Sequence, residues 1–164
     1  MATGTVSSVT GDVWQTIATV TPTSGTTATF SSIAGYKNLL LGWSGVNLGT
    51  SGNLSLRFNG SSTGYVSLTQ VTGQNDYSYT KIELENPTYG AGTTNHTGYI
   101  IINNILSPIP KIVNSLAGST GGGTSVLGNA MWNSTDAITS IVITSTTAFS
   151  GTNTGSFVLY GIAA

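Results

Sequence analysis

Short apolar runs of strand length, separated by turn residues, recur along the whole chain, and no stretch of ten residues has the period of a helix. About ten such runs occur, rich in the β-branched and aromatic residues that favour strands. In residues 53–59, Leu54, Leu56 and Phe58 alternate with polar residues, as in a strand with one buried face. The pattern predicts an all-β fold, closed as a two-sheet antiparallel sandwich that is jelly-roll-like.

Two pairs of neighbouring runs also predict hairpins. Asn59 and Gly60 form a strong turn signal between the runs 53–59 and 65–69. A second polar connection joins the runs 125–133 and 137–145. Each large apolar residue in these and the other runs is a candidate for the core, and we expect the core to contain Trp14, Phe30, Ile33, Leu56, Phe58, Trp132, Leu159, Tyr160 and Ile162.

The run at residues 156–162 is apolar on both faces, which is typical of a central rather than an edge strand. A sheet whose central strand comes last in the sequence is incomplete until that strand is added. We therefore expect truncation before Phe157 to prevent folding, whereas Ala163 and Ala164 are expected to be dispensable.

The length of 164 residues suits one domain. Residues 1–11 are small, polar and without a strand period, so they are predicted to form a flexible arm, and residues 12–164 a single β-sandwich domain. The arm lacks the basic and apolar segments of a signal peptide, and no window reaches the roughly 18 apolar residues of a membrane span. The sequence therefore predicts synthesis in the cytoplasm and no membrane partner.

Charge is scarce, because only 5% of the residues are Asp, Glu, Lys or Arg, against about 25% in a usual soluble domain. With a net charge of −1, the chain has no electrostatic basis for binding nucleic acid. Copies of such a chain repel one another little, which favours assembly. The absence of cysteine excludes disulfides, thiolate metal sites and thiol nucleophiles.

No catalytic motif is evident, and neither a metal nor another cofactor is expected. Glu83 and Glu85 share a strand face in the predicted run 77–85, but two carboxylates on one strand do not flank a glycosidic bond from both sides. The single histidine, His96, is expected to be a solvated loop residue. A Ser-His-Asp triad using His96 remains open by composition, although the chain contains no Gly-x-Ser-x-Gly turn. The chain is therefore predicted not to be an enzyme, with a small β-sandwich hydrolase as the weaker alternative.

The same run 77–85 supplies the candidate interaction site. Tyr77, Tyr79, Lys81 and Glu83 alternate onto one predicted face, and Tyr89 follows in the next loop. Tyrosines on an outward face are typical of protein interfaces. They are also typical of sugar-binding platforms, and both interpretations stay open.

Several motifs in order carry a family resemblance, over residues 14–65 and 132–162. They are Trp14, Thr29-Phe30-Ser31-Ser32-Ile33 with Gly35-Tyr36-Lys37, Leu54-x-Leu56-x-Phe58-Asn59 with Tyr65, and Gly155-Ser156 with Leu159-Tyr160-Gly161-Ile162. In these the chain resembles small virion proteins of tailed bacteriophages, a family that includes capsid decoration, or cement, proteins. The matching positions are strand and turn residues, so the resemblance transfers no functional residue.

The resemblance implies a jelly-roll-like sandwich without catalysis that forms trimers on the outer capsid surface. Its partners would then be copies of itself and the major capsid protein, after synthesis in the host cytoplasm. The alternative function is a receptor- or glycan-binding β domain of a phage tail fibre or spike.

Overall fold

Twelve strands in two antiparallel sheets make up the fold of the described part of the chain, which confirms the prediction of an all-β, two-sheet protein. The computed structural model describes residues 13–50, 52–71, 74–84, 95–106, 108–119, 124–152 and 155–164, and this part of the chain contains no helix. The expected arm at residues 1–11 lies outside the described residues. The strands are β1 (Gln15–Val20), β2 (Thr27–Phe30), β3 (Tyr36–Asn47), β4 (Leu54–Phe58), β5 (Tyr65–Val71), β6 (Gln74–Ser78), β7 (Ile82–Glu83), β8 (Asn95–Asn103), β9 (Lys111–Ser119), β10 (Thr124–Trp132), β11 (Ile141–Ser145) and β12 (Ser156–Ala163).

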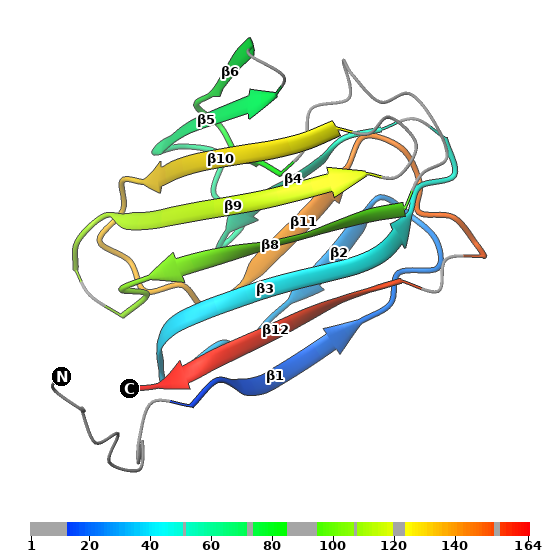
Figure 1. The fold of residues 1–164 in the computed structure, drawn as a ribbon. Helices are drawn as coiled ribbons and strands as arrows, with labels where there is room; N and C mark the ends of the chain where they lie inside the picture. The colour runs from blue at the N-terminus through cyan, green and yellow to red at the C-terminus, as the bar shows by residue number, and fades with distance from the viewer. Residues whose placement is uncertain are drawn as a thin grey trace, which may run out of the picture.

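The two sheets differ in size and lie face to face (Figure 1). The large sheet has eight strands in the order β1-β12-β3-β8-β9-β10-β5-β6, and the small sheet has four in the order β2-β11-β4-β7. Figure 1 looks onto the side of the large sheet that faces away from the small one. Most connections cross from one sheet to the other, because few consecutive strands are neighbours in the same sheet.

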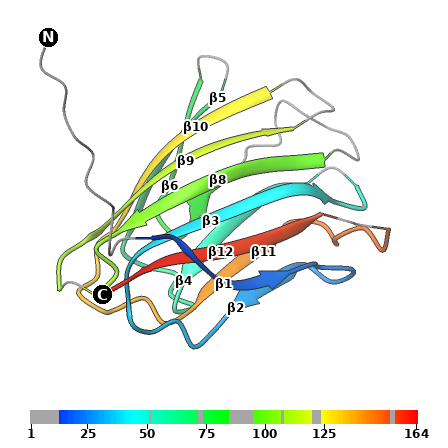
Figure 2. The ribbon, with the colours of Figure 1, turned by 60° about the horizontal axis from the view of Figure 1, so that its bottom comes forward.

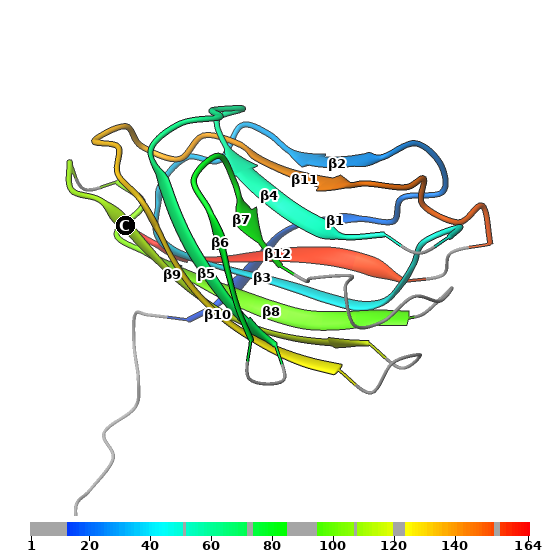
Figure 3. The same ribbon diagram turned by 90° about the horizontal axis from the view of Figure 1, so that it is seen from above.

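Two hairpins, β5–β6 and β9–β10, extend the large sheet beyond β8. The large sheet curves around the small one (Figures 2 and 3), and β5 and β6 lie beside β7 (Figure 3). Two hydroxyl groups of β5 connect the sheets there, since Ser67 Oγ accepts a hydrogen bond from Glu83 N at 3.3 Å and Thr69 Oγ1 donates to Glu83 O at 3.4 Å. The curve thus closes one side of the sandwich with hydrogen bonds.

Both predicted hairpins are wrong. β4 lies in the small sheet and β5 in the large one, and the same holds for β11 and β10. Asn59 does turn the chain, at a positive φ of 52°. Its side chain, however, binds the other crossing connection, with Oδ1 accepting from Thr139 N at 2.8 Å and Nδ2 donating to Ala137 O at 2.8 Å. The turn signal was therefore real, but the turn leads into the opposite sheet.

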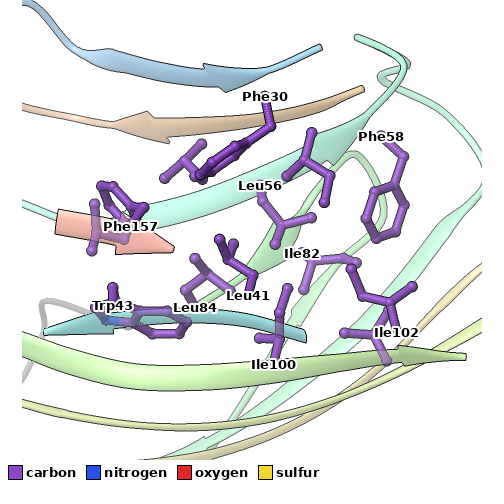
Figure 4. Close-up of a cluster of buried hydrophobic side chains, with 14 of the residues drawn as sticks. Phe30, Leu41, Trp43, Leu56, Phe58, Ile82, Leu84, Ile100, Ile102 and Phe157 are labelled. Carbon is purple, nitrogen blue, oxygen red and sulfur yellow. The ribbon is translucent and has the colours of Figure 1, made fainter. Parts of the chain in front are cut away.

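The core fills the space between the sheets (Figure 4). Six of the predicted core residues are buried there: Phe30, Ile33, Leu56, Phe58, Trp132 and Leu159. The prediction is wrong for Trp14, which is 38% exposed because it precedes β1, an edge strand. Tyr160 and Ile162 are only half-buried, since alternation along β12 turns them away from the small sheet.

β12 lies between β1 and β3, which confirms that it is not an edge strand. It is second from the edge of the large sheet, however, rather than at the centre as predicted. Phe157 and Leu159 are fully buried on its inner face. Gly161 continues this face, and a Cβ there would overlap the ring of Tyr36 and approach Ile17 Cδ1 at 2.8 Å. The close packing explains why glycine is needed at this position.

One lysine is buried, which the sequence did not predict. Lys111, at the start of β9, is 0% exposed. Its ammonium group donates to Ile109 O at 2.9 Å and to Ser134 O at 3.1 Å. Burial lowers the pKa of Lys111, and the charge of Asp136 partly offsets this effect. The lysine thereby ties two neighbouring loops to the sheet.

Tyr65 satisfies an open edge of the small sheet. β7 pairs only with Ser55 and Leu56 of β4, so it ends before Phe58. The buried Tyr65 hydroxyl instead accepts a hydrogen bond from Phe58 N at 2.7 Å and donates one to Phe58 O at 3.4 Å.

We expect Tyr65→Phe to lower the free energy of unfolding by about 1–3 kcal/mol, because two buried backbone groups lose their partner. Denaturant unfolding measures this, and Tyr99→Phe on an exposed tyrosine should change it by less than about 0.5 kcal/mol.

Tyr65 also makes the stability of the protein depend on pH. Burial raises the pKa of Tyr65 above 10.0, although the hydrogen bond from Phe58 and the charge of Arg57 lower it in part. The folded state therefore holds the phenol proton more tightly than the unfolded state. The contribution of the protonated Tyr65 to stability is complete below about pH 10 and is lost as the pH rises through the folded-state pKa of Tyr65. Between about pH 10 and the folded-state pKa, the free energy of unfolding should fall more steeply with pH for the wild type than for Tyr65→Phe. Denaturant unfolding at several pH values measures this, and equal slopes for the two proteins would contradict the raised pKa of Tyr65.

Candidate interaction surface

The outer face of the large sheet, meaning the side turned away from the small sheet, exposes many apolar side chains. Strand alternation buries every second residue of β8, β9, β10 and β5 and turns the others outward. Six of the outward residues are large hydrophobic side chains that are at least 42% exposed: Val66, Tyr77, Tyr99, Ile112, Leu116 and Leu127. An apolar face of this kind is unusual for a surface in contact only with water.

Strand register arranges these residues in rows that cross the sheet. Tyr99 is paired with Leu116, and Leu116 with Leu127, in one row over three strands. In another row, Ile112 is paired with Met131, and Met131 with Val66. Neighbours in such rows lie about 5 Å apart, so their side chains form continuous apolar strips.

Two asparagines lie between the strips. Asn114 and Asn129 are paired across β9 and β10, and Asn114 Nδ2 donates a hydrogen bond to Asn129 Oδ1 at 2.8 Å. Both are exposed. Because this bond satisfies one donor and one acceptor within the pair, the asparagines interrupt the apolar surface less than two separate polar side chains would.

None of the described side chains that β8, β9, β10 and β5 turn outward is charged. Lys111 belongs to β9 but is buried, and Arg57, Lys81 and Glu83 belong to the small-sheet side. With eight strands, and nine residues in each of β8, β9 and β10, the face measures roughly 34 by 30 Å, or about 1,000 Å². That area exceeds the roughly 800 Å² that each partner contributes to a standard protein interface.

The structure separates the residues that the sequence placed in one site. The predicted strand 77–85 is broken, because the chain leaves the large sheet after β6 and enters the small sheet at β7. Tyr77 is 57% exposed on β6, and Tyr79 is 66% exposed just after it. Lys81 and Glu83 instead form an ion pair at 2.9 Å beside β4. Tyr89 lies outside the described residues.

The residues considered as catalytic candidates lie in environments that differ from the predicted ones. His96 was predicted to be a solvated loop residue, and this is wrong: it lies on β8 and is 4% exposed. Glu83 is paired with Lys81, and Glu85 lies outside the described residues. Within the described ranges, no group of three or more His, Cys, Asp or Glu side chains is placed to hold a metal ion. That part of the chain likewise contains no helix able to cross a membrane.

Comparison with known proteins found no matching family model, no matching curated protein and no matching solved structure. The chain is therefore defined by its architecture, an antiparallel two-sheet protein whose larger sheet exposes many apolar side chains on its outer face.

Sequence reasoning missed most of this surface, although a signal was present. Ile112, Leu116 and Leu127 alternate with residues that are also apolar or small, so no single strand shows which face is buried. Only the lack of any charge in residues 112–132 distinguishes this region, since a strand face in contact with water usually contains some.

Proposed function

We propose that the chain is a non-enzymatic capsid decoration, or cement, protein of a tailed bacteriophage. In this proposal it is made in the host cytoplasm, self-associates as a trimer and binds the major capsid protein on the outer surface of the shell. The observation that carries the proposal is the apolar outer face of the large sheet, where the described outward side chains of β8, β9, β10 and β5 include no charge. The resemblance of its strand and turn motifs to small phage virion proteins supports the same function.

The strand order supports a jelly roll with two added hairpins. Without β5–β6 and β9–β10, the sheets have the orders β1-β12-β3-β8 and β2-β11-β4-β7. Eight strands arranged in two such sheets are what a jelly roll requires. The two hairpins supply five of the six exposed hydrophobic residues, and only Tyr99 comes from the eight-strand part. The two added hairpins thus build most of the apolar face.

The occupant that we assign to the outer face is another copy of the chain. A face without charge is matched best by a partner surface without charge, and this chain supplies such a surface itself. A net charge of −1 gives little repulsion between copies. The area of about 1,000 Å² is sufficient for a stable contact. An oligomer held in this way would bind a symmetric shell at several points, which increases its avidity without new contacts.

Introducing a charge at the centre of the face tests the proposal. We expect Leu116→Asp to weaken self-association by on the order of 3 kcal/mol per contact, more than a hundredfold in Kd, because the carboxylate would be buried without a partner. Sedimentation velocity measures the change, and binding to purified capsids should fall with it. Thr29→Asp adds the same charge on the exposed side of the small sheet and should leave both unchanged. A wild-type chain that stays monomeric at high concentration and does not bind capsids would refute the proposal.

A tail-fibre or spike domain that binds a receptor or glycan is the second candidate. Exposure of Tyr77 and Tyr79 at the sheet edge favours it, because exposed aromatic rings stack on sugars. The number of copies per particle separates the two functions. Hundreds of copies indicate a shell protein, and a few copies indicate a tail protein.

A further inference from the structure

A small hollow on the outward side of the small sheet gathers the basic side chains of this charge-poor chain. It has a volume of about 190 Å³ and is lined by Ser55, Arg57, Lys81, Thr144, Ser145 and Thr146. The sequence contains only four Lys and Arg residues, and two of them line this one hollow. The rest of the lining consists of hydroxyl side chains.

Strand register explains why an anion suits this position. Ser55 is paired with Glu83, and Leu56 with Ile82, so the next residues, Arg57 and Lys81, face each other. Like charges directly opposite one another across two strands are unfavourable. Glu83 neutralises one of them through its ion pair with Lys81 at 2.9 Å. One positive charge is left over, which matches a singly charged anion better than a doubly charged one.

The donors are held in place by the surrounding structure. Arg57 Nε donates to Thr80 O at 3.1 Å, which orients the guanidinium group. Within the described part of the chain, its terminal nitrogens have no hydrogen bond and can donate in parallel to a carboxylate. Thr146 Oγ1 accepts from Asn53 N at 2.9 Å, so its own hydrogen is left to donate. The hollow therefore offers a charged fork next to several hydroxyl groups.

We propose that this hollow binds a carboxylated sugar, with the carboxylate on Arg57 and Lys81 and the sugar hydroxyls on Ser55, Thr144 and Thr146. A carboxylate carries the single negative charge that the site lacks, and its two oxygens fit the guanidinium fork. Hydroxyl side chains are suited to the ring hydroxyls of a sugar. The volume is smaller than that of most ligand pockets, which restricts the bound part to about one sugar unit. This site is independent of the outer face and goes beyond the proposed shell function.

Titration of the full chain with glucuronate, followed by NMR chemical shifts at low salt, tests the site. We expect shifts at Arg57 and Thr144, binding at least about tenfold weaker for glucose, which lacks the carboxylate, and weakening by added salt. Arg57→Gln should reduce glucuronate affinity at least about tenfold. Lys37→Gln removes a cation elsewhere in the chain and should have no effect on binding.

One further variant and two further ligands complete the test. Thr144→Val keeps the side-chain shape and the charges, so a loss of glucuronate affinity in this variant supports sugar recognition even where Arg57→Gln disturbs the fold. Glucose binding as tight as glucuronate, or an equal loss with Lys37→Gln, would overturn the proposal. Inorganic phosphate that binds more tightly than glucuronate would also overturn the proposal. Equal binding of N-acetylglutamate and glucuronate would show that the site recognises any carboxylate rather than a sugar.

Discussion

A chain that ends at Ser156 is expected not to fold. The truncation deletes Phe157 and Leu159, whose side chains are fully buried between the sheets. Losing each large buried side chain costs about 2–5 kcal/mol, against a total stability of about 5–15 kcal/mol for a domain. It also removes the strand with which β1 pairs and leaves one edge of β3 open. Circular dichroism should show no cooperative thermal transition.

Deleting only Ala163 and Ala164 is the matched control. Both residues are exposed, and the main loss is the hydrogen bond from Ala164 N to Gly35 O at 3.0 Å. We expect a cost of about 1 kcal/mol and a retained sharp transition. A sharp, native-like transition in the chain ending at Ser156 would contradict the role that the structure gives to β12.

The sequence predicted the individual strands better than it predicted how they associate. β4 has a clear two-residue period in its sequence, because Leu54, Leu56 and Phe58 alternate with polar residues, and such a period is a local property of the strand. Association depends on where the chain goes after each turn. Asn59 has the same turn chemistry whether the next strand pairs with β4 or crosses to the other sheet. Because that choice is decided by packing between distant segments, both predicted hairpins were wrong.

The candidate site was harder to predict for a related reason. The alternation of Tyr77, Tyr79, Lys81 and Glu83 fits a single strand, yet the chain changes sheets between Ser78 and Ile82. This change directs the tyrosines to one side of the molecule and the ion pair to another. Arg57 and Lys81 come together only because β4 and β7 pair, and they lie far apart in the sequence. Sequence patterns show which residues share a strand face, but only the sheet topology shows which faces meet.

A second large effect is expected at Gly155, immediately before β12. The register between β3 and β8 shifts between Trp43 and Val46, and Gly45 adopts a positive φ of 64° at this shift. The shift brings the backbone of Gly45 against Gly155, where a Cβ would overlap the carbonyl group of Gly45 and the nitrogen of Val46. Both atoms belong to the backbone of a paired strand, so neither can move away as a flexible side chain would.

We therefore expect Gly155→Ala to cost about 3 kcal/mol or more, at or beyond the upper end for overpacking, and to lower Tm by roughly 6–12 °C. Gly42→Ala is the matched control in β3, because a Cβ there has no atom within 4 Å and φ is not positive. That substitution should be neutral or should stabilise the protein by up to about 1 kcal/mol, since alanine restricts the unfolded chain. Differential scanning calorimetry on the two variants compares them directly. Equal Tm values would show that the strands can separate at Gly155 without loss, in which case the close approach of Gly45 to Gly155 would not be needed to hold β12 in the sheet.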